Sequence, residues 1–147
     1  MSSLFDNQPS PKSRERLEDG AMLLRGFATD EAALLLEEVA RVTNAAPFRN
    51  LVTPGGYTMS VAMTNCGRVG WVSDVTGYRY DPLDPQSGRA WPPMPETFKK
   101  IALLAAAEAG FAQYDPDACL INRYIAGSKL SHSRPDRQWR RHQDRFL

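Results

Sequence analysis

An alternating stretch from residue 57 to residue 65 constrains the fold of this chain more than any other feature. One side of the alternation is aromatic or apolar, and the other side is small or hydroxylated: Tyr57, Met59, Val61 and Met63 against Thr58, Ser60, Ala62 and Thr64. A period of two residues is that of a β-strand. Because the turn-forming sequence Thr53-Pro-Gly-Gly56 precedes it, the stretch predicts a strand that follows a tight turn.

Two more stretches are β-prone and two are helical. Residues 71–80 follow the turn sequence Cys66-Gly-Arg-Val-Gly70 and are expected to form a hairpin with the strand at 57–65. Further strands are expected at 21–27 and at 119–125. Helices are expected from about Glu31 to Arg41 and from Pro95 to Gly110, where apolar residues recur at helical spacing. The mixture predicts an α+β fold.

Three segments lack regular periodicity. Residues 1–20 are polar and are expected to be a flexible arm, and the proline-rich residues 81–95 are expected to be a loop. Residues 132–147 contain five Arg and two Asp without a helical or strand period, so we expect a poorly packed tail.

Composition excludes some classes of protein. The chain has 147 residues, which favours one domain, and no apolar run approaches the roughly 18 residues of a membrane span. Its start does not resemble a secretory signal. Cys66 and Cys119 lack a CxxC spacing and are interpreted as two free thiols in a cytoplasmic protein. The net charge is only +1, so any argument for nucleic-acid binding must come from specific residues.

Two groups of residues suit the binding of a ligand. The first is aromatic and methionine-rich, and comprises Met59, Met63, Trp71, Tyr78 and Tyr80 with Tyr57. Flat rings and thioethers can hold an extruded base by stacking, but the same residues could be ordinary core, or could line a groove for another ligand.

The second group lies on the expected strand at 119–125. Asn122 and Tyr124 alternate onto one face and offer an amide and a phenol together. They could bind a ligand, or they could be a buried polar pair that neighbouring strands satisfy.

The order of these motifs resembles that of AlkB-type dioxygenases. The resemblance is carried by 54–67, by Trp71 and by Tyr78-Arg-Tyr80, then by Asp84-Pro-Gln86, Trp91-Pro, Met94-Pro and Leu120-Ile-Asn-Arg-Tyr124, and it covers about residues 20–131. It implies the N-terminal part of a double-stranded β-helix (jelly-roll) dioxygenase at 21–131, with a nucleotide-recognition lid at about 50–95 and an incomplete barrel.

The resemblance also implies an activity and its sites. AlkB-type enzymes use Fe(II) and 2-oxoglutarate to demethylate alkylated bases in DNA, possibly RNA, with release of formaldehyde. The expected partner is alkylated single- or double-stranded DNA, possibly RNA. No membrane association is expected, and the folded chain is expected to be a monomer. By resemblance, Met59, Met63, Trp71 and Tyr78-Arg79-Tyr80 would contact the substrate. Asn122, Arg123 and Tyr124 would bind 2-oxoglutarate.

The metal site is where this sequence departs from the family. AlkB-type enzymes have His-x-Asp directly after the equivalent of Ser131 and a second His much later, whereas this chain continues His132-Ser-Arg-Pro. His142 and Asp144 have the right spacing but are displaced by about ten residues. They could be ligands moved by an insertion, a coincidence in an out-of-frame tail, or a makeshift triad with His132. Without the second His and the C-terminal Arg residues of the family, the alternative is an inactive remnant, at most a weak nucleic-acid-binding module.

Overall fold

The structure is a computed structural model, and it describes residues 11–128. The described chain is α+β, as predicted, and runs β1 (Ser13–Glu18), β2 (Ala21–Arg25), α1 (Ala32–Ala45), β3 (Arg49–Val52), β4 (Thr58–Gly67), β5 (Gly70–Asp74), β6 (Gly77–Asp81), α2 (Glu96–Glu108) and β7 (Ala118–Arg123). Both expected helices form within the described residues, and α1 extends beyond Arg41 to Ala45. No helix among the described residues is long and apolar enough to cross a membrane.

The N-terminal hairpin differs from the expected flexible arm. Residues Ser13–Glu18 form β1, which pairs antiparallel with β2. Gly20 makes the connection with φ 77°, a conformation that side chains other than glycine adopt at a cost. Arg25 and Glu15 form an ion pair of 3.0 Å across the hairpin. The exposed, polar side chains of β1 hide its strand character from the sequence, because strand pairing here depends on the backbone and on β2.

The central sheet has three antiparallel strands in the order β3-β4-β7. Strand β4 lies in the middle: it pairs with β3 up to Met63 and with β7 from Ala62 to Gly67. At the end of β4 nearest to β5 in sequence, the N–H of Gly67 donates to the carbonyl of Pro92 over 2.9 Å, not to β5. Strand β5 pairs with β6 instead. The expected hairpin between the strand at 57–65 and residues 71–80 is wrong for this reason, and residues 71–80 are two strands joined by a turn rather than one.

Both faces of β4 are covered. Residues 61–66 are all buried, which a strand with one face in water would not show. On one face, the hydroxyl of Thr64 donates to the carbonyl of Ala46 at the end of α1, over 2.6 Å. On the other face, Met63 lies opposite Asn122 of β7 and Arg49 of β3. The position of β5 relative to this second face defines the site described below.

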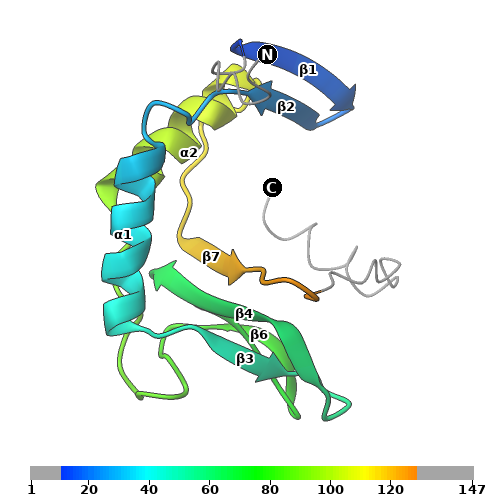
Figure 1. The fold of residues 1–147 in the computed structure, drawn as a ribbon, viewed down its shortest axis with the longest axis vertical. Helices are drawn as coiled ribbons and strands as arrows, with labels where there is room; N and C mark the ends of the chain where they lie inside the picture. Colours follow the sequence, from blue (N-terminus) through cyan, green and yellow to red (C-terminus); the bar gives the residue numbers. More distant parts are fainter. Residues whose placement is uncertain (1–10, 129–147) are drawn as a thin grey trace, which may run out of the picture.

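The helices connect the two sheet regions. Figure 1 shows the β1–β2 hairpin near the end of α2, and α1 running from there down to the sheet that contains β3, β4 and β7. Helix α2 has no fully buried residue among those described, and Leu104 of its predicted apolar stripe is half exposed. The folded core therefore lies at the β4 end, where Ala46, Val72 and Trp91 form one buried cluster.

Candidate functional site

A single buried amide fixes the start of β5 against the central sheet. The Asn65 side chain donates to the carbonyl of Trp71 and accepts from its backbone N–H, each over 2.9 Å, and Asn65 is only 2% exposed. In the β4–β7 register, Asn65 lies opposite Leu120, so it shares a face with Leu120 and, two residues along, with Asn122. The backbone of Trp71 is thereby held over the sheet face that carries Asn122.

The β5–β6 hairpin presents an aromatic surface. Trp71 lies opposite Tyr80, and Ser73 lies opposite Tyr78, so these side chains share one face. The rings of Trp71 and Tyr78 are stacked, with centroids 5.6 Å apart and an interplanar angle of 19°. Tyr78 and Tyr80 are more than half exposed. Of the predicted aromatic and methionine-rich group, Trp71, Tyr78 and Tyr80 thus share one face of the hairpin, whereas Met63 is buried in β4 and the exposed Tyr57 lies outside the hairpin.

Arg79 faces the other way. It lies opposite Val72, on the reverse face of the hairpin, and pairs with Asp74 at 2.8 Å and Asp81 at 3.4 Å. The hydroxyl of Thr76 and then Arg79 lower the pKa of Asp74 to about 2. Arg79 therefore holds the hairpin turn together, and the structure separates it from the two tyrosines with which the sequence groups it.

A buried ion pair supports the loop that follows the hairpin. Arg49 Nη1 donates to Asp84 Oδ1, and its guanidinium carbon lies 5.2 Å from the centre of the Trp91 ring. Trp91 Nε1 in turn donates to the carbonyl of Asp81 over 2.9 Å. Burial acts to raise the pKa of Asp84, but the hydrogen bonds from Arg49 and Gln86 and the Arg49 charge outweigh it, so the pKa is lowered. This network fixes the proline-rich loop, which is irregular as predicted.

Asn122, at the end of β7, and Tyr124, which follows it, are accessible polar groups. Asn122 is exposed, Tyr124 is 50% exposed, and neither makes a side-chain hydrogen bond within residues 11–128. The alternative of a satisfied buried pair therefore does not hold for the described part of the chain. Arg123 differs from both: it is on the opposite face, opposite Ala62, with its guanidinium carbon 4.6 Å from the centre of the Phe48 ring. Of the three residues predicted to bind 2-oxoglutarate, Asn122 and Tyr124 are therefore accessible donors, whereas Arg123 packs against Phe48 on the opposite face of the sheet.

The two methionines also separate by burial. Met63 is 6% exposed and packs in the middle of β4, opposite Asn122. Met59 is half-buried near the start of the strand. Of the two, Met59 is the one that a ligand could touch without rearrangement.

No three His, Cys, Asp or Glu side chains are grouped to hold a metal ion within the described range. The predicted ligands His142 and Asp144, and His132, lie outside that range. The metal assignment therefore stays a prediction.

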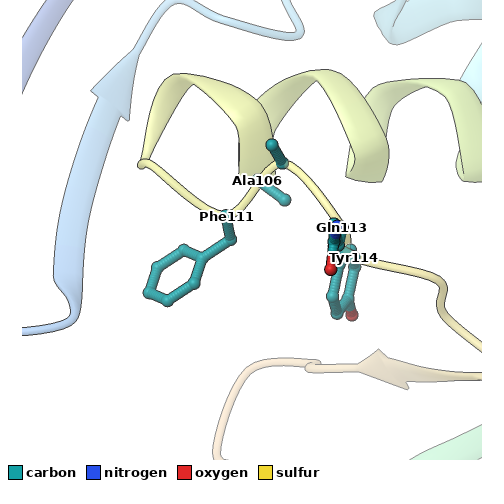
Figure 2. A pocket seen from close by; sticks show the side chains of 5 residues that line it. Ala106, Phe111, Gln113 and Tyr114 are labelled. Carbon is teal, nitrogen blue, oxygen red and sulfur yellow. The ribbon is translucent and has the colours of Figure 1, made fainter.

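An apolar cavity lies apart from this surface. It has a volume of about 750 Å³ and is lined by Ala106, Phe111, Ala112, Gln113 and Tyr114. Figure 2 shows Phe111 and Tyr114 on the segment that follows α2. The lining carries no charged side chain, so this cavity does not suit a dicarboxylate such as 2-oxoglutarate.

Comparison with known proteins identifies the family. The sequence profile of the 2OG-Fe(II) oxygenase superfamily matches residues 20–144, which is most of the chain. The chain belongs to this superfamily. It is 52% identical over 118 residues to the alpha-ketoglutarate-dependent dioxygenase AlkB of Escherichia coli (strain K12), and the match covers 80% of this chain and 55% of that protein.

Other relatives agree with this placement. The AlkB protein of Salmonella typhimurium (strain LT2) is also 52% identical over 118 residues, with the same coverage. An AlkB homolog of Caulobacter vibrioides (strain NA1000) is 41% identical over 96 residues, covering 65% of this chain and 42% of that protein. The AlkB-type resemblance of the sequence is thus confirmed, and the chain spans about half the length of the curated relatives it matches.

Two structural residues of the site were not singled out in the sequence. Asn65 lies among the buried residues 61–66 of β4. Because a buried amide needs hydrogen-bond partners, a polar residue in this stretch could have indicated a structural role. Arg49 gives no such signal, because its partners Asp84 and Trp91 are more than thirty residues away.

Proposed function

We propose that this chain contributes the nucleotide-recognition surface and the 2-oxoglutarate-binding strand of a dioxygenase that demethylates alkylated bases in DNA, with RNA as the other possible substrate. The observation that carries the proposal is the pair of hydrogen bonds between Asn65 and Trp71. They hold the backbone of Trp71, whose ring stacks on Tyr78, over the sheet face that carries Asn122. This supports a site in which an aromatic surface and accessible polar donors act together.

Each group has a distinct role in this proposal. The stacked rings of Trp71 and Tyr78, with Tyr80 beside them, bind an extruded base and the adjoining nucleotide, because every base has a face that can stack. The Asn122 amide and the Tyr124 hydroxyl donate hydrogen bonds to the oxygens of 2-oxoglutarate. Their exposure and their lack of other partners in the described chain fit that acceptor-rich cosubstrate.

The chemistry requires groups that the chain would bind. Iron(II) and 2-oxoglutarate, when bound, supply the oxidising power that hydroxylates the N-alkyl carbon, after which formaldehyde is released. The residues described here bind and orient: the stacked rings keep the base out of the duplex, and Asn65 fixes the backbone that carries the Trp71 ring. His142 and Asp144 remain the proposed metal ligands.

Two measurements test the proposal. The full chain is incubated with Fe(II), 2-oxoglutarate and a methylated oligonucleotide, and formaldehyde is measured. In parallel, 2-oxoglutarate binding is measured by calorimetry for the chain and for Asn122→Ala. Leu120→Ala is the matched control, because Leu120 lies two residues earlier on the same face of β7. Formaldehyde release, together with binding that Asn122→Ala weakens and Leu120→Ala does not, supports the function.

The second candidate, a nucleic-acid-binding module without catalysis, uses the same exposed aromatic surface. It is supported instead if the chain binds methylated oligonucleotides but neither binds 2-oxoglutarate nor releases formaldehyde. Absence of both binding activities overturns the two candidates together.

A further inference from the structure

The two cysteines of the chain lie directly opposite each other on neighbouring strands. Cys66 of β4 pairs with Cys119 of β7 in the antiparallel register, although 52 residues separate them in the sequence. Directly opposed residues share a face, so their side chains point the same way. Figure 1 shows β4 and β7 side by side. The sequence, with its two isolated cysteines and no CxxC motif, gives no sign of this proximity.

The backbone spacing at this position suits a covalent link. Opposed residues of an antiparallel pair have Cα atoms about 4.5 or 5.5 Å apart, depending on the type of pair. A disulfide needs a Cα separation of about 4.4–6.8 Å. The Cα separation of either kind of pair therefore falls within the range. The Cβ atoms of opposed residues lie about 4.5–5.5 Å apart, against about 3.5–4.5 Å in a disulfide, so the strands must approach by about 1 Å to join the sulfurs.

The two thiols have different environments. Cys66 is completely buried, whereas Cys119 is partly accessible. The interaction between the two thiols, together with burial, raises the pKa of Cys66, and the same interaction lowers the pKa of Cys119. Cys119 is therefore the sulfur that more readily becomes the thiolate, and it is also the one that a small oxidant can reach.

We propose that Cys66 and Cys119 form a redox-active pair that a hydroperoxide converts into a cross-strand disulfide between β4 and β7. The Cys119 thiolate attacks one peroxide oxygen, which breaks the O–O bond, forms a sulfenic acid and releases hydroxide or alkoxide that takes up a proton. Cys66 then attacks the Cys119 sulfur, an S–S bond forms, the S–O bond breaks, and the Cys66 proton leaves with the oxygen as water. Two electrons pass from the thiols to the peroxide.

The product links two functional strands. Strand β4 carries Asn65, which holds Trp71, and β7 carries Asn122. The disulfide therefore fixes the relative position of these strands and makes it dependent on redox conditions. This inference does not depend on the proposed function, because it concerns the thiols alone.

The test is oxidation of the full, folded chain with hydrogen peroxide, followed by alkylation of the remaining thiols and mass spectrometry. The chain has two cysteines, so the expected result is unambiguous: both thiols disappear together, the intact mass falls by that of two hydrogen atoms, and a digest contains the linked Cys66–Cys119 peptides. Dithiothreitol should restore both thiols.

Two variants test the order of the steps. In Cys66→Ser, Cys119 should stop at the sulfenic acid and be trapped by dimedone. In Cys119→Ser, Cys66 should stay unmodified under the same conditions. The wild-type experiment is sufficient if a variant does not fold. The proposal is overturned if wild-type Cys119 accumulates as sulfinic acid while Cys66 stays free, if links form only between molecules, or if both thiols survive.

Discussion

Asn65 and Trp71 are joined by two hydrogen bonds of 2.9 Å, in which one side-chain amide takes the place that a neighbouring strand would fill. The amide has one donor side and one acceptor side, as a peptide group has. It therefore satisfies both backbone groups of Trp71 at a point where β5 cannot pair with β4. A single side chain thus sets how the aromatic hairpin sits on the central sheet.

Replacing Asn65 by alanine should destabilise the fold by roughly 2–4 kcal/mol, because it leaves the N–H and the carbonyl of Trp71 without partners in a part-buried place. Urea denaturation measures this change. Asn50→Ala is the matched control: Asn50 is exposed and makes one hydrogen bond, to the carbonyl of Met59, so its loss should cost less than about 1 kcal/mol. Equal effects of the two variants would contradict the role given to Asn65.

Gly70→Ala tests the close approach between β5 and Trp91. A Cβ at this position would lie 2.4 Å from Cε2 of Trp91 and 2.8 Å from Cβ of Asn65. Such overpacking typically costs about 1–3 kcal/mol, and we expect the thermal midpoint of the chain to fall accordingly. Gly55→Ala is the control, since its added Cβ would meet only ordinary contacts of 3.4–3.8 Å and should leave the midpoint nearly unchanged.

Removing one member of the buried Arg49–Asp84 pair should destabilise the fold more than replacing both, because it leaves one buried charge without a partner. Both side chains are less than a tenth exposed, and Arg49 Nη2 has no partner among the described atoms. Asp84→Ala should therefore cost about 3–5 kcal/mol, because it strands the guanidinium in a buried place. The double variant Arg49→Met with Asp84→Leu should cost less than Asp84→Ala alone. Denaturation of the three proteins decides this, and a double variant less stable than the single one would refute the explanation.

Much of the architecture follows from local patterns, and the failed prediction of a hairpin between β4 and β5 has a non-local cause. The strand at 57–65 and both helices were predictable because their apolar residues recur with a fixed period. The pairing of β4 was not predictable, because its second partner, β7, lies about fifty residues further along. With β7 along residues 62–67 and the carbonyl of Pro92 bonded to the N–H of Gly67, β5 pairs with β6 and the expected hairpin does not form.

The pairing and alternation of the strands also decide which predicted site residues lie together. Trp71, Tyr78 and Tyr80 were identified together, and the register of β5 and β6 brings them together. Arg79 and Arg123 were grouped with their sequence neighbours, but alternation along a strand sends adjacent residues to opposite faces. Asp74 and Phe48 are the partners that fix these two arginines.

Acid should loosen the hairpin turn at Asp74. The pKa of Asp74 is lowered to about 2 in the folded chain, by Thr76 and then by Arg79, whereas an unfolded Asp titrates near 3.9. A lowered pKa means that this contribution to stability is complete above about pH 4 and is lost as the pH falls toward 2. Comparison of urea midpoints at pH 7 and at pH 2.5 should show a smaller acid-induced fall for Asp74→Asn than for the unmodified chain. An equal fall in the two proteins would mean that Asp74 does not contribute.

Tyr78→Ala should weaken binding of a methylated single-stranded oligonucleotide by roughly 5- to 150-fold, because stacking of a base on an aromatic ring is worth about 1–3 kcal/mol. Tyr78 is 53% exposed and stacks on Trp71, so its removal takes away the accessible ring without opening the core. Tyr114→Ala is the matched control, since Tyr114 is 48% exposed but lines the apolar cavity after α2. Fluorescence anisotropy of a labelled oligonucleotide measures both variants. If Tyr114→Ala weakens binding as much as Tyr78→Ala does, the hairpin is not the recognition surface.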